Sequence, residues 1–194
     1  MIVGLGNPGR EYSGTRHNVG FMVAEALVER WELGRGKDRF RGRIAEGRAR
    51  PAGGPQLGAQ SPRVAVLCPQ TFMNDSGRSV GPARGALKVA LDHVVVVHDE
   101  IDLPFGEVRT RLGGGLAGNN GLKSIKRELG SADFIRVRVG VGRPDSTDPE
   151  IVSAHVLGRF AEPPADVQAL VARACEHVER AVLEQDGAQP PAAS

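Results

Sequence analysis

Four consecutive valines, Val94 to Val97, form the segment that most restricts the fold of this chain. A strand with apolar side chains on both faces must be covered on both faces, which is typical of interior strands in α/β sheets. Segments with helical spacing alternate along the chain with segments of strand-like pattern. We therefore predict a single three-layer α/β domain, whose twisted sheet is mixed but largely parallel and is flanked by helices.

The length of 194 residues suits one domain, which we place at residues 1–187, followed by a disordered tail at 188–194. Cys68 and Cys175 have neither metal nor redox spacing, which indicates a reducing compartment and a cytoplasmic protein. The longest aliphatic run, Val94 to Val97, is too short to span a membrane, so we expect no membrane partner. Nothing in the pattern indicates an obligate interface, and we expect a monomer.

The periodicity divides the chain into helices and strands. Helices are expected at residues 19–34, 76–88, 119–129 and 163–187, with Asn18 and either Asn119 or Asn120 as caps and Gly34 and Gly130 as terminators. Strands are expected at residues 2–3, 40–46, 63–67, 93–98, 107–112 and 134–141. Residues 47–62 are rich in Gly, Pro and Arg and predict a long, mobile hairpin loop.

The segment Gly4 to Gly9 matches the pattern GxGxxG, which in dinucleotide-binding proteins opens a long helix. Here Pro8 and Gly14 interrupt the segment that follows, and regular helical spacing begins only at Val19. A pyrophosphate would therefore lack the helix N-terminus that binds it. The glycines indicate a tight turn, and a dinucleotide-dependent oxidoreductase is disfavoured.

His17 and Asp99 are candidates for acid–base chemistry. His17 directly precedes the first helix, whose positive end should disfavour imidazolium and keep a neutral base available. A lone histidine there would more simply be a packing or capping residue. Asp99, however, ends the valine strand, at the sheet edge where α/β folds bind ligands, and a carboxylate there can orient the imidazole. With no GxSxG serine and no activated cysteine, direct attack by water is favoured.

Neighbouring polar residues allow other interpretations. His98, Asp99, Glu100 and Asp102 suggest a metal site, but consecutive strand residues face opposite ways, so we expect no metal. Three asparagines on predicted loops have amides suited to hold a carbonyl, a water or an oxyanion, although each is also a common loop or cap residue. They are Asn7, Asn74 and Asn120.

Basic residues are concentrated in one part of a chain whose net charge is only +2. Between residues 109 and 143 the acidic residues are Glu128 and Asp133, while the basic ones are Arg109, Arg111, Lys123, Lys126, Arg127, Arg136, Arg138 and Arg143. Three of these cations share the polar side of the helix at 119–129. The cluster fits either a phosphate-bearing partner or a solvated surface.

Five motifs occur in the order and spacing of one known family: GLGNPGREYSGTRHNVGF, TFMNDSGRSVG, HDEIDLPFG, GNNGLKSI and FIRVRVGVGRP. From Ile2 to about Gly158, and more loosely through the last helix, the chain resembles bacterial peptidyl-tRNA hydrolase. The resemblance implies a single-domain α/β hydrolase without metal or organic cofactor. Its substrate would be peptidyl-tRNA, in which it cleaves the ester between peptide and tRNA and so recycles tRNA from aborted translation.

The resemblance also implies roles for individual residues. His17 would be the base that activates water, and Asp99 the carboxylate that orients it. Asn7 and Asn74 would position substrate and water.

Further residues of the matching motifs would bind the tRNA and the nascent peptide. Asn120 would hold the peptide or the terminal adenosine, Tyr12 would line the crevice near the ester, and Met73 would contact the tRNA 3' end. Arg111 and Arg138 would surround the 5' phosphate of the acceptor stem.

Asn119 departs from the pattern, because the family usually has a histidine at this position. An amide can form hydrogen bonds but cannot ionise near neutral pH, so substrate orientation or turnover can differ. An alternative function is therefore a catalytically weak RNA-binding paralogue, comparable to the related plastid splicing factors. Retention of the residues assigned to catalysis and positioning argues against that alternative.

Overall fold

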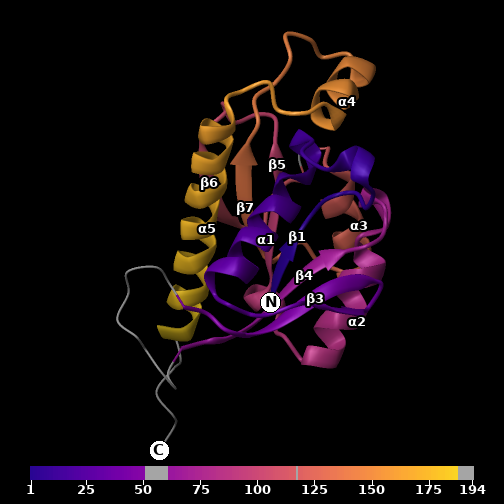
Figure 1. Cartoon of the computed structure of the whole chain (residues 1–194). Helices are drawn as coiled ribbons and strands as arrows, with labels where there is room; N and C mark the ends of the chain where they lie inside the picture. Colours follow the sequence, from indigo (N-terminus) through magenta and orange to yellow (C-terminus); the bar gives the residue numbers. More distant parts are fainter. Residues whose placement is uncertain (51–60, 117, 188–194) are drawn as a thin grey trace, which may run out of the picture.

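The computed structural model describes residues 1–50, 61–116 and 118–187. Seven strands form one sheet in the order β2-β3-β4-β1-β5-β7-β6 (Figure 1). The strands are β1 (Ile2–Gly4), β2 (Lys37–Arg39), β3 (Gly42–Arg48), β4 (Arg63–Pro69), β5 (Val95–Glu100), β6 (Val108–Leu112) and β7 (Ile135–Gly140). Parallel pairing joins β4, β1, β5 and β7, whereas β2, β3 and β6 are antiparallel to their neighbours. The prediction of a mixed, largely parallel sheet is confirmed.

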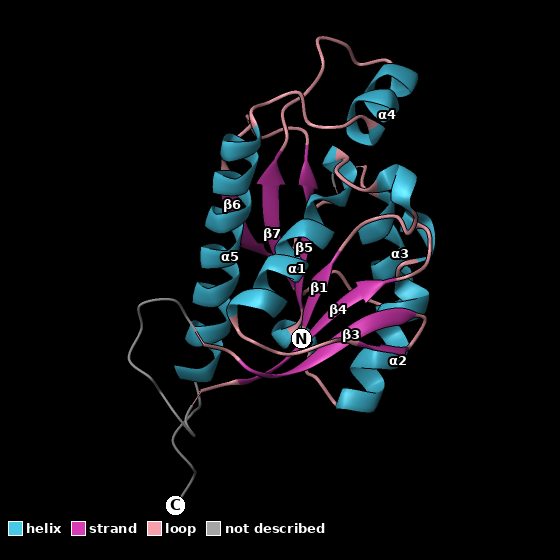
Figure 2. Cartoon of the chain, in the orientation of Figure 1, coloured by secondary structure: helices cyan, strands magenta, loops and turns pink. Residues whose placement is uncertain are grey.

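Helices cover both faces of the sheet and form the predicted three layers (Figure 2). They are α1 (Val19–Arg30), α2 (Gly77–Leu87), α3 (Asn120–Leu129), α4 (Pro149–Leu157) and α5 (Pro164–Gly187). α1 and α5 pack on one face, where Val95 and Val97 join their core, while α2 and α3 pack on the other with Val96. Every residue of β5 is buried, as the valine run predicts.

Two glycines set the short distance between α1 and the sheet. A Cβ on Gly20 would lie 2.5 Å from the backbone nitrogen and oxygen of Leu5 and 2.5 Å from the carbonyl oxygen of Val97. A Cβ on Gly4 would collide with the carbonyl oxygen of Gly20. The first turn of α1 therefore rests directly on backbone atoms beside β1 and β5. This contact places the residues that precede α1 next to the end of β5.

The first boundary that differs from the sequence prediction is the end of α1. Gly34 does not terminate this helix, which ends at Arg30, with Trp31 as its C-cap. Glu32, with φ 52°, takes the left-handed position, and the amide of Leu33 donates to the carbonyl of Val28. The turn has the hydrogen bonds of a C-cap in which glycine is usual. Glu32 occupies that position here, two residues before the predicted terminator Gly34.

The other differences are elements without a clear sequence signal. Strand β3 begins at Gly42 rather than at Phe40, because Phe40 and Arg41, both with positive φ, form the two-residue turn after β2. Helix α4 was not predicted; Asp148 caps it by accepting from the amide of Glu150. The predicted helices at 76–88 and 119–129 are confirmed within one residue at each end.

In the ranges that the structure describes, no helix is both long enough and apolar enough to span a lipid bilayer. The central part of the predicted hairpin loop, residues 51–60, and the predicted tail at 188–194 lie outside the described residues.

Candidate functional site

The candidate site lies where the parallel strands end. β1, β4, β5 and β7 run in the same direction, so their carboxyl ends meet at one edge of the sheet. Asn7 follows β1, Met73 follows β4, and Asp99 is the second-to-last residue of β5. His17 reaches this edge from the short 3-10 helix η2 (Arg16–Asn18), which precedes α1. The sheet topology thus collects residues that are far apart in sequence.

His17 and Asp99 form the central pair of the site. Nδ1 of His17 lies 2.8 Å from Oδ2 of Asp99, and the side chains are 15% and 3% exposed. Burial lowers the pKa of His17, but the charge and hydrogen bond of Asp99 outweigh burial, and the net pKa is raised above 6.5. The expectation that this pKa is kept low is therefore wrong, because the carboxylate of Asp99 contacts the imidazole and favours its charged form.

Asn7 is fixed by two neighbours. Its backbone nitrogen donates to Oδ1 of Asn18 (2.9 Å), and Nδ2 of Asn18 donates to its backbone oxygen (2.9 Å). Asn18 precedes α1 as predicted, but its side chain makes no capping hydrogen bond and is used for this pairing. Oδ1 of Asn7 accepts from the backbone nitrogen of Met73 at 2.8 Å. With that oxygen occupied, the Nδ2 amide group is the part of Asn7 left for a substrate.

Asn119 makes a contact with Asp99 that the sequence did not reveal. Its Oδ1 accepts from the backbone nitrogens of Gly121 (3.0 Å) and Leu122 (3.1 Å), so of the two predicted candidates it is Asn119 that caps α3. Its Nδ2 donates to Oδ1 of Asp99 at 3.1 Å. The capping signal was readable from the sequence, but the contact with Asp99 depends on how the segment between β6 and α3 folds back to β5.

The remaining predicted contact residues lie on loops and helix ends around this edge. Met73 is buried, and its sulfur is beside Gly121 at the start of α3, where a Cβ would collide with it. Asn74 and Asn120 are exposed, and Asn120 is the first residue of α3 rather than its cap. Tyr12 is half-buried in the 3-10 helix η1 (Arg10–Tyr12), before η2.

Arg16 ties the turn that carries His17 to the segment after α4. Its Nη1 donates to the backbone oxygen of Arg159 (2.6 Å), its Nη2 pairs with Glu162 (3.2 Å), and its guanidinium lies 5.5 Å from the Phe160 ring centre. The backbone joins the same segment, through a bridge between Thr15 and Arg159 and through the amide of Arg16, which donates to the carbonyl of Gly158. The turn that carries His17 is therefore fixed to the segment after α4.

Several cations of the basic cluster, residues 109–143, are engaged in contacts within the protein. Arg136 is buried and donates to the carbonyls of Gly113 and Gly115, and burial followed by the charges of Arg111 and Arg138 lowers its pKa. Other cations are paired with carboxylates: Arg109 with Glu107, Arg138 with Glu100, and Arg143 with Asp102.

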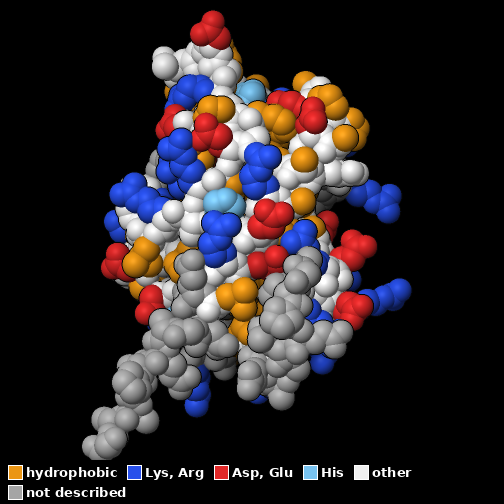
Figure 3. All heavy atoms as spheres, turned by 90° about the vertical axis from the view of Figure 1, so that its left-hand side faces the viewer, with side chains coloured by type: hydrophobic (Ala, Val, Ile, Leu, Met, Phe, Trp, Pro, Cys, Tyr) orange, Lys and Arg blue, Asp and Glu red, His pale blue; other side chains and the backbone are white. Residues whose placement is uncertain are grey.

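Apart from the buried Arg136, the cations of the cluster that form no ion pair with another described residue are exposed. They are Arg111 on β6 and the α3 stripe of Lys123, Lys126 and Arg127, where the prediction of an exposed stripe holds. On the side of the molecule that carries α5 and β6, basic and acidic side chains intermingle (Figure 3). The number of cations available to a partner is therefore smaller than the number of basic residues in this part of the sequence.

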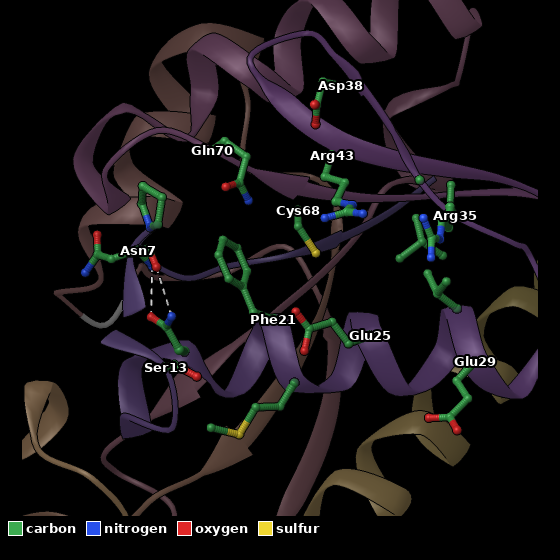
Figure 4. A pocket seen from close by; sticks show the side chains of 18 of the residues that line it. Asn7, Ser13, Phe21, Glu25, Glu29, Arg35, Asp38, Arg43, Cys68 and Gln70 are labelled. Carbon is green, nitrogen blue, oxygen red and sulfur yellow. Dashed lines mark hydrogen bonds between the residues drawn. The ribbon is translucent and has the colours of Figure 1, made fainter. Parts of the chain in front are cut away.

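A cavity of about 760 Å³ lies beside the site, between α1 and strands β3 and β4. Asn7 and Asn18 line one end of it, whereas Phe21 and Glu25 of α1 face Arg43 and Cys68 of the sheet (Figure 4). Burial raises the pKa of the Cys68 thiol to about 12, which leaves it a poor nucleophile. Because neither His17 nor Asp99 lines this cavity, the acid–base pair lies outside it.

The side chains weighed as a metal site do not converge. His98 is buried and places Nδ1 2.7 Å from the backbone oxygen of Asp99, while burial lowers the pKa of its imidazole. Glu100 pairs with Arg138, and Asp102 with Arg143. Within residues 1–50, 61–116 and 118–187, no group of three or more His, Cys, Asp or Glu side chains has an arrangement suited to a metal.

Known proteins match the chain over nearly its whole length. The family model described as peptidyl-tRNA hydrolase matches residues 1–190. A peptidyl-tRNA hydrolase of Rhodopseudomonas palustris is 43% identical over 178 residues, which cover 91% of this chain and 82% of the relative. One of Syntrophotalea carbinolica is 45% identical over 161 residues, covering 83% and 78%.

Solved structures agree with this assignment. The crystal structure of peptidyl-tRNA hydrolase from Acinetobacter baumannii superposes with a TM-score of 0.78 at 37% identity, covering 95% of this chain and 88% of that one. Both the fold and the family expected from the motifs are thereby confirmed. The chain belongs to the peptidyl-tRNA hydrolase family.

Proposed function

We propose that His17 is the general base of this peptidyl-tRNA hydrolase and that Asp99 orients it. The observation that carries the proposal is the hydrogen bond of 2.8 Å between Nδ1 of His17 and Oδ2 of Asp99. A carboxylate on Nδ1 favours the tautomer that carries its proton there, so the lone pair of Nε2 is left to accept a proton from water. The imidazole is 15% exposed, which suits a group that must meet solvent water.

The reaction follows from these groups. His17 Nε2 removes a proton from water, and the hydroxide oxygen bonds to the ester carbonyl carbon, whose electron pair moves onto the carbonyl oxygen. The Nδ2 group of Asn7 donates to this oxyanion, because its own oxygen is occupied by Met73. When the intermediate collapses, the bond to the ribose oxygen breaks and imidazolium returns the proton to that oxygen. Peptide acid and free tRNA leave.

The surrounding residues are assigned to the two halves of the substrate. Exposed Asn120 and buried Met73 lie together at the start of α3, where they would hold the 3' end and the peptide. Asn74 would position the water, and Tyr12 would line the crevice beside η2. Arg111 and Arg138, on neighbouring strands β6 and β7, would contact the 5' phosphate of the acceptor stem. The protein would act as a cytoplasmic monomer.

Hydrolysis measured across pH tests the base directly. Purified protein should release the acyl group from diacetyl-lysyl-tRNA, with kcat/KM falling on the acid side as His17 takes up a proton. Since the pKa of His17 is raised, the midpoint of this fall should lie above the ordinary histidine value of 6.5. Asp99→Asn removes the charge that raises the pKa, so its midpoint should move to lower pH while the rate falls. A binding-only paralogue predicts no release, and a profile without an acidic limb contradicts His17 as base.

Arg111→Ala tests the phosphate contact. Arg111 is exposed and carries no internal ion pair among the described residues, so its removal should raise KM for tRNA substrates several-fold and leave kcat unchanged. Arg63→Ala is the control, because Arg63 is also exposed but begins β4, at the edge of the sheet opposite the site. An equal rise in KM for both variants would show a general charge effect instead of a local contact.

A further inference from the structure

Asp99 receives a second hydrogen bond that the proposed reaction does not use. Its Oδ2 faces His17, while its Oδ1 accepts from Nδ2 of Asn119 at 3.1 Å. The carboxyl group of Asp99 is thereby held at both oxygens, by the turn before α1 and by the cap of α3. A carboxylate with one partner can rotate about its terminal bond, whereas one held at both oxygens cannot do so without losing a contact.

The orientation of the Asn119 amide is imposed by α3. Its Oδ1 accepts from two backbone amides, those of Gly121 and Leu122, so the nitrogen is the end that faces Asp99. An oxygen in that place would face the carboxylate oxygen without a proton between them. The two accepted bonds also polarise the amide, which strengthens its donation to the carboxylate.

α3 is a firm support for this contact. Its ten residues bury Leu122 and Ile125 in the core beneath the sheet, and Gly121 lies against the sulfur of Met73 and the side chain of Leu5. The cap therefore cannot shift without moving packed residues. Arg136 also holds the connection that leads to it, through the carbonyls of Gly113 and Gly115.

We propose that Asn119 is a positioning residue of the catalytic pair: by capping α3 and donating to Oδ1 of Asp99, it fixes Oδ2 on His17. This inference rests on the proposed function of His17 and Asp99. It gives the departure from the usual family motif a role that needs no ionisable side chain. A residue that only capped α3 would affect stability, whereas a positioning residue also sets the titration of His17 and the catalytic rate.

Other charged groups near the pair are engaged elsewhere. On β5 itself, His98 contacts the Asp99 carbonyl and Glu100 pairs with Arg138 of β7. On η2, Arg16 pairs with Glu162. A charge introduced at position 119 therefore acts on His17 and Asp99 through the contact under test.

Asn119→Asp is the discriminating variant. Asp caps helices as well as Asn does, so α3 should form, and Tm should change by no more than about 4 °C. Its second oxygen would lie about 3 Å from Oδ1 of Asp99, where both carboxyl groups ionise together only beside a compensating cation, so ionisation of the pair favours imidazolium at His17. The pKa of His17 should rise by about one unit, and kcat near neutral pH should fall about tenfold, with partial recovery at higher pH.

Asn119→Ser separates positioning from charge. A serine hydroxyl can still cap α3 but is too short to hold Asp99 as well. We expect kcat to fall about threefold to tenfold with KM unchanged, because a hydrogen bond to the carboxylate is lost without a new charge. Gln168→Glu, an exposed amide-to-carboxylate change on α5, is the matched control and should leave the His17 titration unchanged.

The His17 titration is best read by NMR of the free protein, where the spectrum of His17→Ala assigns its signal among the five histidines. An unchanged titration in Asn119→Asp overturns the inference. So does a higher KM with unchanged kcat in Asn119→Ser, which would make Asn119 a substrate contact. The NMR titration needs no substrate, so its result is distinct from failure of the proposed base, which would appear as activity retained by His17→Ala. The kinetic result for Asn119→Ser is interpreted only where His17→Ala has lost activity.

Discussion

His17→Ala is expected to lower the rate of ester hydrolysis by roughly 10²- to 10⁴-fold, the usual contribution of a general base. The alanine leaves water without a proton acceptor, while Asn7 keeps its contacts with Met73 and Asn18. Binding should survive, because the exposed cations of β6 and α3 are unaffected. The measurement is single-turnover release from N-blocked aminoacyl-tRNA, with tRNA affinity determined separately.

A control is needed for folding, because Asp99 loses a partner in this variant. Asn119 still donates to Asp99, so the carboxylate keeps one hydrogen bond, and the thermal transition should stay cooperative. Turnover at the wild-type rate by His17→Ala would exclude the assignment of the base. Loss of both turnover and tRNA affinity would point to a collapsed site instead of a missing proton acceptor.

Gly20→Ala is expected to cause a large loss of stability through a single added methyl group. The new Cβ would lie 2.5 Å from three backbone atoms, at Leu5 and Val97, so the helix must move away from the sheet. Overpacking of this kind costs about 3 kcal/mol. His17 precedes α1 by two residues, and a displacement of about 1 Å would reduce activity about 100-fold. Denaturant unfolding and the hydrolysis assay measure the two effects.

Gly85→Ala is the matched control for this substitution. Gly85 also lies inside a helix, α2, but a Cβ there meets nothing within 4 Å. Alanine should stabilise that helix by about 0.5–1 kcal/mol, because it restricts the unfolded chain more than glycine does. If both variants lost similar stability, the close approach of α1 to β1 and β5 would not be the cause.

The position of the site was predictable because it follows from a general property of parallel sheets. Asp99 ends a strand whose valines are buried on both faces, and the carboxyl ends of such strands share one edge. Asn7 and Met73 reach that edge for the same reason. The proposal that His17 is the base could be made from the sequence only when Asp99 was considered with it.

The parts that could not be predicted depend on contacts between distant segments. Asn18 has the sequence signature of a cap, yet its amide pairs with the backbone of Asn7. Phe40 adopts a positive φ at a turn position where glycine or asparagine is usual. The position of Asn119 before a helix predicted that it could act as a cap. Its contact with Asp99 depends on where α3 lies relative to β5, which the local sequence does not determine.

The pairing of the arginines affects how salt should act on this protein. Each phosphate neutralised by a free cation releases condensed counterions, and affinity falls with salt in proportion to their number. Arg109, Arg138 and Arg143 already face carboxylates, and Arg136 is turned inward to carbonyls. Their positive charge is partly balanced before tRNA arrives. The ionic-strength dependence of tRNA binding should therefore reflect mainly Arg111 and the three cations of α3, rather than all eight basic residues of the segment.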